Sequence, residues 1–385
     1  MPLFGTIRIV LLSGIALLIT YTLTAKTYYN YAAWKNTLFI ILILFTITIF
    51  ASILVSFDRG RTLDVLEMNL RYFIITAVMV KIIDNIKRLD YTLGLFALCG
   101  IVMALHTIIN YLYTGFTYIG SIRGAAIESG IFADPNDLAL FLNTVLPILF
   151  YFFIQSKRKI LLIISISLVV TAIILTYSRG GLLGLIAVFF GILIFRRQAR
   201  AKILILGICC TVLITALVPE TYKERISTIQ TEARVDAETG KYPGRAQAWV
   251  ELVPLLLSMS PLLGVGAGCS TYFAGIHYGH WGLMHNSFLQ ALLELGLVGF
   301  LLFLALFWLP FKQYWKIKKR NDKTENTQKL IDRYQFMLIS LIGFAVPAFF
   351  LPQAYSPILY FLIGALIVQN ELAPREPQLN QSQET

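Results

Sequence analysis

Three arginines stand at positions where an ordinary membrane protein would not place them. Arg179 lies between two apolar runs in the sequence TYSRGG, Arg245 follows Pro243-Gly244 at the start of a predicted helix, and Arg123 precedes the sequence DPND. A guanidinium group stays charged, and its planar fork binds two phosphate oxygens at once. The three arginines therefore predict a phosphate or pyrophosphate site. The alternative for Arg179 is an interface anchor, whose long side chain reaches from the membrane to the polar region.

His285 is the candidate general base. It lies where a long loop meets an apolar run, in the sequence MHNSFLQ. A histidine can take up a proton near neutral pH, as a base that activates a hydroxyl group must. Asn286 follows it and can orient either the imidazole ring or a bound acceptor. The alternative is that His285 only caps a helix or forms hydrogen bonds within the loop.

A metal site is the other chemistry that these residue types can support. His277, His280 and His285 follow the spacing H-x2-H-x4-H, but no carboxylate or cysteine stands at matching ligand spacing and no H-E-x-x-H is present. Asp134 and Asp137 could also bind a cation. Asp-Pro-Asn-Asp before an apolar run is more typical of a helix N-cap with proline at the first helical position. We therefore predict no metal ion and no cofactor.

Three glycines alternate with other small residues at 264, 266 and 268. A G-x-G-x-G sequence can cradle a phosphate when it joins a strand to a helix, but no strand is predicted before it. Close packing of one backbone segment against another is the favoured interpretation.

The elements that position these residues must lie in lipid. The chain has 385 residues, of which 57% are hydrophobic and only 14% charged, and its mean hydropathy is +0.72. Soluble proteins carry about 25% charged residues, so this composition excludes a cytosolic enzyme, a disordered chain and a secreted disulfide scaffold. The net charge of +11 is explained by basic cytoplasmic loops, so we predict membrane lipids and no nucleic acid as partners.

The hydropathy pattern predicts an all-α, polytopic transmembrane bundle of about 11–12 spans with one large, partly helical loop. Eleven apolar runs approach the length that a bilayer demands, at 3–24, 36–56, 62–83, 91–113, 135–154, 160–177, 181–195, 203–219, 286–311, 335–352 and 355–372. The predicted regions are an N-terminal bundle (1–219), the large loop (220–285), C-terminal transmembrane helices (286–372) and a disordered cytoplasmic tail (373–385).

Basic residues predict the orientation of the spans, because they collect in cytoplasmic loops. The segments 157–159, 196–202 and 312–333 are rich in Lys and Arg, whereas 114–134 and 178–180 hold only Arg123 and Arg179. The loop 220–285 contains five basic and six acidic residues, so its charges nearly balance. The segments 114–134, 178–180 and 220–285 are therefore predicted to share the outer face of the membrane. Several arginines on that face favour an anionic lipid substrate that carries a pyrophosphate.

Four stretches with these residues resemble the O-antigen ligase and O-antigen polymerase superfamily. They run from Arg123 to Ala139, from Leu175 to Gly181, from Gly244 to Gly266, and from His285 to Gly296. The resemblance implies a GT-C-like glycosyltransferase with its active site at the periplasmic face of the bacterial inner membrane. It also implies a donor glycan on undecaprenyl pyrophosphate and, in ligases, a lipid A–core acceptor.

The resemblance also implies roles for individual residues. Arginines matching Arg179 and Arg245 bind the donor diphosphate in the ligases, with Arg123 carried over as a third, and the histidine matching His285 is the proposed base. Transfer would be inverting and independent of metal. Some ligases show His-x-His-Asn, where this chain has Leu283-Met284-His285-Asn286, so an O-antigen polymerase that joins lipid-linked repeat units stays open. A non-catalytic transporter of polyprenyl lipids is the other alternative.

Overall fold

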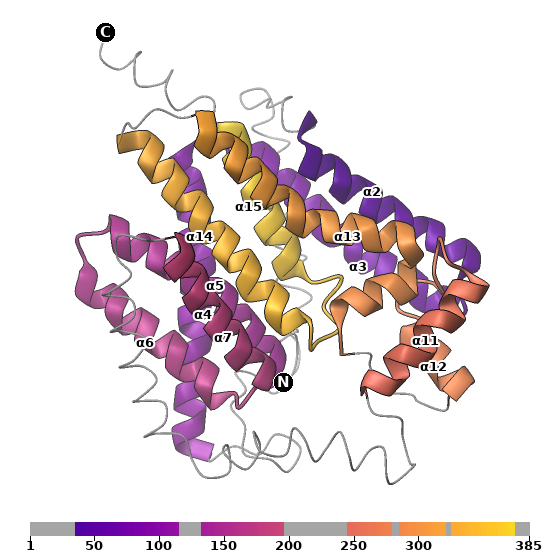
Figure 1. The fold of residues 1–385 in the computed structure, drawn as a ribbon. Helices are drawn as coiled ribbons and strands as arrows, with labels where there is room; N and C mark the ends of the chain where they lie inside the picture. Colours follow the sequence, from indigo (N-terminus) through magenta and orange to yellow (C-terminus); the bar gives the residue numbers. More distant parts are fainter. Residues whose placement is uncertain (1–34, 115–131, 196–244, 279–284, 321–324, 374–385) are drawn as a thin grey trace.

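Helices form nearly all of the structure, a computed structural model that describes residues 35–114, 132–195, 245–278, 285–320 and 325–373 (Figure 1). No strand occurs among these residues, which confirms the all-α prediction. The helices are α2 (Thr37–Ala51), the short η2 (Ser52–Val55), α3 (Arg59–Ile82), α4 (Ile86–Thr114), α5 (Pro135–Gln155), α6 (Lys159–Leu175), α7 (Arg179–Phe195), α11 (Arg245–Met259), α12 (Ser270–Tyr278), α13 (Ser287–Arg320), α14 (Glu325–Ala348) and α15 (Pro357–Leu372).

Five of the described helical segments are long and apolar enough to cross a membrane: α2 with η2, α4, α5, α13 and α14. Three shorter apolar helices, α6, α7 and α15, accompany them. The protein is therefore a polytopic helical membrane protein, as its composition predicted. Two of the eleven predicted spans, 3–24 and 203–219, lie outside the described residues, as does the predicted tail apart from Ala373. The total number of spans stays a prediction.

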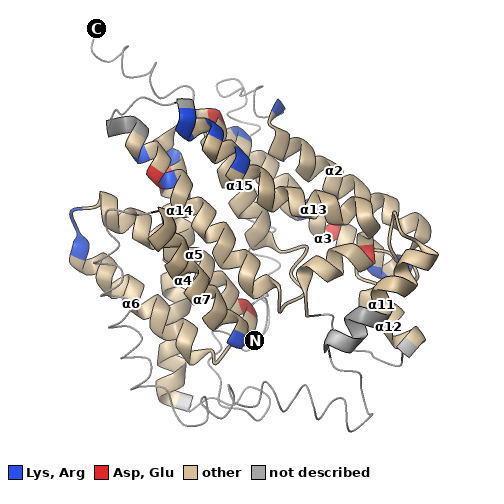
Figure 2. Ribbon diagram, in the orientation of Figure 1, with Lys and Arg blue, Asp and Glu red and all other residues tan. Residues whose placement is uncertain are grey.

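A buried arginine holds one end of the bundle together. Arg333, near the start of α14, donates from Nε to Asp90 Oδ1 at 2.8 Å and from Nη2 to Asp90 Oδ2 at 3.2 Å. It also donates to the Tyr151 hydroxyl at 3.1 Å and to Gln369 Oε1 at 3.4 Å. These bonds join the starts of α4 and α14 to the ends of α5 and α15. We call this the charged end, because Lys and Arg gather where α13 ends and α14 begins (Figure 2).

The opposite end holds the starts of α5, α7, α13 and α15, and we call it the site end. The basic segment 157–159 joins α5 to α6 at the charged end, whereas 178–180 lies at the site end. This grouping agrees with the one predicted from charge, although which end faces the cytoplasm stays a prediction. The segments 196–202 and 220–244, and Arg123 with them, lie outside the described residues.

Helices from the two predicted transmembrane regions pack directly against one another. α14 packs against α5 and α7, and α13 packs against α2 (Figure 1). Small residues allow the close approach, because a Cβ on Gly343 would lie 2.4 Å from the Asn143 carbonyl oxygen and one on Gly184 would lie 2.6 Å from Pro347. The predicted region boundaries at 219, 285 and 372 therefore divide the sequence only. The described helices from the N-terminal and C-terminal regions pack together.

The last two predicted spans are separated by more residues than the hydropathy pattern indicates. α14 ends at Ala348 and α15 begins at Pro357, whereas the predicted runs were 335–352 and 355–372. Phe349, Phe350 and Leu351 are apolar, so hydropathy extended the first run through them. In the structure the residues 349–356 form a loop at the site end, bounded by the helix-starting Pro357.

Candidate functional site

The loop 349–356 joins the starts of three helices at the site end. Ser287, the first residue of α13, donates from Oγ to the Leu351 carbonyl at 2.6 Å and accepts from the Gln353 backbone N–H at 2.8 Å. The Gln353 side chain donates to Asp137 Oδ1 in the first turn of α5 at 2.8 Å. Phe350 packs against α7, because a Cβ on Gly180 would lie 3.3 Å from it. The loop therefore brings segments near 137, 180 and 287 together.

Arg179 is the first residue of α7 and is half-buried. The preceding Ser178 accepts a hydrogen bond from the Gly181 N–H at 3.0 Å and so caps the helix. Asn143 on α5 donates to the Gly181 carbonyl at 2.9 Å and fixes this turn against the neighbouring helix. A rigid helix start thus carries the guanidinium group that the sequence singled out.

His285 precedes α13 and is half-buried, with a positive backbone φ of 45°. Among the described residues, only His285 and Tyr177, with φ of 50°, adopt this left-handed conformation without being glycine. Each lies at or beside a predicted site residue, since Tyr177 is two positions before Arg179. Such backbone conformations cost about 1–3 kcal/mol and concentrate at functional sites.

Asn286 has a structural role that the sequence left open. Its Oδ1 accepts hydrogen bonds from the backbone N–H groups of Phe288 at 2.9 Å and Leu289 at 3.1 Å, and its side chain is buried. Asn286 is therefore the N-cap of α13. The cap holds the start of the helix directly after His285 and so limits the positions that the histidine can take. Its predicted contact with an acceptor stays a prediction.

Helix starts at the site end favour negative charge there. The starts of α5, α7, α13 and α15 all lie at this end, and each contributes the partial positive charge of its helix dipole. Asp134 caps α5 by accepting from the Asn136 N–H at 2.7 Å, and Pro135 occupies the first turn, which confirms the N-cap prediction. The electrostatics of four helix starts add to the charge of Arg179.

Gly264 and Gly266 pack closely against the backbone of Glu294 and Ser56, as predicted, whereas the nearest neighbour of Gly268 is the Val65 side chain. All three have positive φ, and a Cβ on Gly264 would lie 2.5 Å from the Glu294 backbone. The turn forms backbone hydrogen bonds with α13 where Gly296 interrupts the helix with φ of 65° and ψ of −166°. Val265 N–H donates to the Leu293 carbonyl at 2.9 Å, and Leu297 N–H donates to the Pro261 carbonyl at 2.8 Å. The C-terminal part of the large loop is thus hydrogen-bonded to α13 at the point where Gly296 interrupts the helix.

Glu294 connects this turn to the loop 349–356, a role that sequence reasoning missed. Its buried carboxylate accepts hydrogen bonds from the Gly268 N–H at 2.8 Å, from Ser270 Oγ at 2.5 Å and from the Tyr355 hydroxyl at 2.8 Å. Burial and the neighbouring Glu294 raise the pKa of Tyr355 well above its usual value, so its hydroxyl keeps the proton that it donates. A carboxylate within an apolar run was the signal that could have identified this residue.

The remaining predicted site residues are only partly described. Arg245 is the first residue of α11, which packs against α13 beside α12 (Figure 1), but its side chain lies outside the description. Arg123 and His280 lie outside the described residues. His277 is described and packs its ring against Phe273, at 4.7 Å between ring centroids. The structure therefore brings Arg179 and His285 to one end of the bundle, and the convergence of Arg245 and Arg123 with them stays a prediction.

An apolar groove of about 610 Å³ begins beside the site and runs along α7. Its walls come from α7, α14, the start of α13 and the loop between α14 and α15: Leu183, Ile186, Ala187, Phe190, Phe288, Ala345, Val346, Phe349 and Phe350. Because Leu183, Ile186 and Phe190 follow Arg179 at intervals of 4, 7 and 11 residues, they lie on the same face of α7 as the arginine. The groove thus leads from a fixed positive charge toward the middle of the bundle.

Residues 161–304 match the family model described as O-antigen ligase. The match runs from α6 through α7, α11 and α12 to the middle of α13, and so includes Arg179, Arg245 and His285. It confirms the resemblance to this superfamily and covers three of the four sequence stretches, whereas the stretch from Arg123 to Ala139 lies outside the match. A search of curated proteins found no match to this chain.

Proposed function

Because residues 161–304 match the O-antigen ligase family, whose members are glycosyltransferases, we propose that this protein transfers a glycan from undecaprenyl pyrophosphate to a sugar of lipid A–core. Transfer takes place at the periplasmic face of the bacterial inner membrane. The observation that carries the proposal is the loop 349–356, which joins the helix start that follows His285 to the helix start that carries Arg179.

The charges at the site end support a diphosphate leaving group. As the glycosidic bond to the donor breaks, the departing diphosphate gains negative charge, which fixed donors stabilise in the transition state. Arg179 at the start of α7, with the N–H groups of that helix start, supplies such donors on a rigid element. Arg245 and Arg123 complete the set in this proposal. Removing one such donor typically costs about 3 kcal/mol of transition-state stabilisation.

The groove along α7 suits the polyprenyl chain of the donor. A lipid diphosphate bound by Arg179 has its chain directed toward the bilayer, and the groove begins one helical turn below that arginine. From Arg179 to Phe190 the helix rises about 16 Å, at ~1.5 Å per residue, which accommodates several isoprene units. The wall is apolar, so a hydrocarbon chain binds there without leaving a polar group unsatisfied.

His285 acts as the general base in this proposal. It accepts the proton of an acceptor sugar hydroxyl as the hydroxyl oxygen attacks the anomeric carbon of the donor, and the bond from that carbon to the diphosphate oxygen breaks. Direct attack from the side opposite to the leaving group inverts the anomeric centre. A positioned base of this kind contributes about 10²–10⁴-fold to the rate.

Transfer of a labelled glycan by the purified protein tests the proposal. Lipid-linked glycan and lipid A–core are supplied together in vesicles, and the product is separated by mass. Labelled lipid A–core is the expected product, whereas extension of the lipid-linked glycan without lipid A–core means a polymerase. Movement of the lipid between leaflets without any new glycosidic bond means a transporter. In a deletion strain, a core without long chains and free lipid-linked polymer indicate a ligase, whereas a core with one repeat indicates a polymerase.

A tryptophan in the groove tests the donor's binding mode. Ile186→Trp fills part of the groove, and we expect the KM for the lipid-linked donor to rise about tenfold or more with little change for the acceptor. Ile163→Trp on α6 is the matched control, because Ile186 is 42% exposed and Ile163 is 51% exposed on the surface of the described helices. Equal kinetics for the two variants would mean that the polyprenyl chain binds elsewhere.

A further inference from the structure

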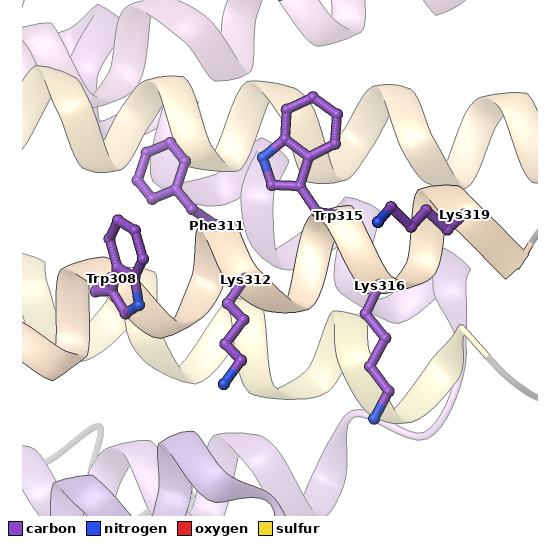
Figure 3. A pocket seen from close by; sticks show the side chains of 6 residues that line it. All are labelled: Trp308, Phe311, Lys312, Trp315, Lys316 and Lys319. Atoms are coloured by element: carbon purple, nitrogen blue, oxygen red, sulfur yellow. The ribbon is translucent and has the colours of Figure 1, made fainter.

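The second half of α13 carries another groove, at the charged end, that the proposed reaction does not use. It has a volume of about 800 Å³ and is lined by Trp308, Phe311, Lys312, Trp315, Lys316 and Lys319 (Figure 3). This part of α13 lies at the charged end, because Gln313 accepts a hydrogen bond from Asn370 at 2.5 Å and the Tyr314 hydroxyl accepts one from Gln335 at 2.7 Å. The groove is therefore far along α13 from His285.

Its lining residues follow one face of the helix. Trp308 is followed by Lys312, Trp315, Lys316 and Lys319 at intervals of 4, 7, 8 and 11 residues, the spacing of a single helical stripe. Both tryptophans are largely exposed, Trp308 by 70% and Trp315 by 53%, and the three lysines are exposed. Nothing in the described chain covers this stripe of large apolar rings and ammonium groups.

The chemistry of the stripe changes along the helix axis. Trp308 and Phe311 come first, and Lys316 and Lys319 end the stripe about 16 Å further along, at ~1.5 Å per residue. A phospholipid shows the same order from the bilayer outward, with acyl chains first, then the glycerol region and then the phosphate. Indole rings favour the interfacial region, and lysine side chains extend from it toward the headgroups.

We propose that this groove binds an anionic glycerophospholipid. The acyl chains lie against Trp308 and Phe311, and the phosphate is bound by Lys312, Lys316 and Lys319. None of the described residues that line the groove is acidic, so the charge of this lining is complementary to a lipid phosphate. Lys318 adds a further cation beside it, with its ammonium group 5.2 Å from the centroid of the Trp315 ring.

A second copy of the chain fits the groove less well. In a symmetric dimer the same patch lies on both partners, so the lysines of one copy would meet those of the other. Like charges at such an interface are unfavourable. An anionic lipid neutralises the lysines, and basic sites of this kind on the cytoplasmic side of membrane proteins attract anionic headgroups. The proposal is independent of the proposed glycosyltransferase reaction.

Lipid retention by the full-length protein tests the proposal. Purified protein is incubated with equal amounts of phosphatidylglycerol, cardiolipin and phosphatidylcholine, and bound lipids are counted by native mass spectrometry. Each lysine contributes roughly fivefold to binding at an anionic surface. The variant Lys312→Gln/Lys316→Gln/Lys319→Gln should therefore lose about a hundredfold in its preference for the anionic lipids. If the protein retains more cardiolipin than phosphatidylglycerol, the groove binds two phosphates. If it retains equal amounts of the two lipids, the groove binds one phosphate.

A matched variant separates the groove from general surface charge. Lys87, Lys157 and Arg158 are also exposed at the charged end, so Lys87→Gln/Lys157→Gln/Arg158→Gln removes the same number of cations without changing the groove. It should keep the wild-type preference. An equal loss in both triple variants, or no anionic preference in the wild-type protein, overturns the proposal.

Tryptophan fluorescence locates the lipid. In vesicles, brominated phosphatidylglycerol should quench the wild-type protein more than brominated phosphatidylcholine does. This difference should largely disappear in Trp308→Phe/Trp315→Phe, which keeps aromatic rings but removes the two indoles. A difference that persists in the double variant means that the anionic lipid binds elsewhere. A dimer that dissociates in this variant without any lipid dependence means that the groove is a protein interface, and either result contradicts the proposal.

Discussion

The Tyr355 hydroxyl donates a 2.8 Å hydrogen bond to the Glu294 carboxylate, which links the loop 349–356 to the first half of α13. The same carboxylate accepts from Gly268 and Ser270, at the start of α12. One buried acceptor therefore joins the large loop, the His285 helix and the loop that contacts α5 and α7. Because these segments share a single carboxylate, a change at one of them should be transmitted to the others.

Tyr355→Phe should destabilise the protein by about 1–3 kcal/mol, because it removes one donor from a buried carboxylate without removing the ring. Thermal unfolding of the protein in detergent measures the change. Tyr91→Phe is the control, since Tyr91 is 73% exposed and its ring lies on the surface. Equal unfolding temperatures for the two variants would show that the hydrogen bond contributes nothing to stability.

Arg179→Lys and Arg245→Lys should each lose transfer activity by at least about tenfold, although the charge is kept. An ammonium group is a point charge and cannot reproduce the two parallel hydrogen bonds of a guanidinium group with phosphate. Transfer rates at matched expression are the measurement. Arg158→Lys at the charged end and Arg234→Ala in the mixed-charge segment should both stay near wild type. Near-wild-type rates for the two lysine variants would identify Arg179 and Arg245 as anchors.

His285→Asn should abolish most transfer, with the 10²–10⁴-fold loss expected for a missing base. Asparagine tolerates the left-handed backbone of this position and keeps hydrogen bonding, so a purely structural role of His285 would survive the change. His285→Gln tests the same point with a longer amide, and His277→Gln serves as control. A rate above about a tenth of wild type in both His285 variants would exclude a catalytic base.

The pH profile gives an independent view of His285. Only the deprotonated imidazole accepts a proton, so transfer should rise with pH as the histidine loses its proton and then level off. In His285→Asn the residual rate should lack this rise. Binding of the lipid-linked donor should be retained in that variant, because Arg179 is unchanged. A pH profile of the same shape in both proteins would place the titrating group elsewhere.

Gly296→Ala should destabilise the protein strongly. Its φ of 65° costs about 1–3 kcal/mol for a residue with a side chain, and the new Cβ would lie 2.4 Å from the Leu262 backbone. Gly94→Ala on α4 is the matched control, because its Cβ would meet its nearest neighbour, Phe152, at an ordinary 3.8 Å. Unfolding temperatures of the two variants make the comparison. A tolerated Gly296→Ala would mean that the interruption of α13 is not required.

Cysteine labelling tests the orientation of the bundle. In a background without native cysteines, Arg234→Cys should react with an impermeant reagent applied from outside, and Lys318→Cys should react only after the membrane is opened. The cation-rich end is expected to face the cytoplasm. Labelling of Lys318→Cys in intact cells would reverse the assignment and place Arg179 and His285 on the cytoplasmic side.

The sequence by itself determined the helical membrane architecture, because each apolar run of about 20 residues satisfies its own backbone and needs no distant partner. It also predicted the Asp134 cap, which the structure confirms, and it singled out Arg179 and His285 as candidate site residues, since capping residues and fixed charges have local signatures. Only the tertiary structure revealed the loop 349–356, because hydropathy assigned its first, apolar residues to the predicted span 335–352. Tyr355 and Gln353 acquire their roles from partners more than sixty residues away, Glu294 and Asp137. Hydropathy measures one segment at a time, whereas buried hydrogen bonds and grooves depend on how segments pack.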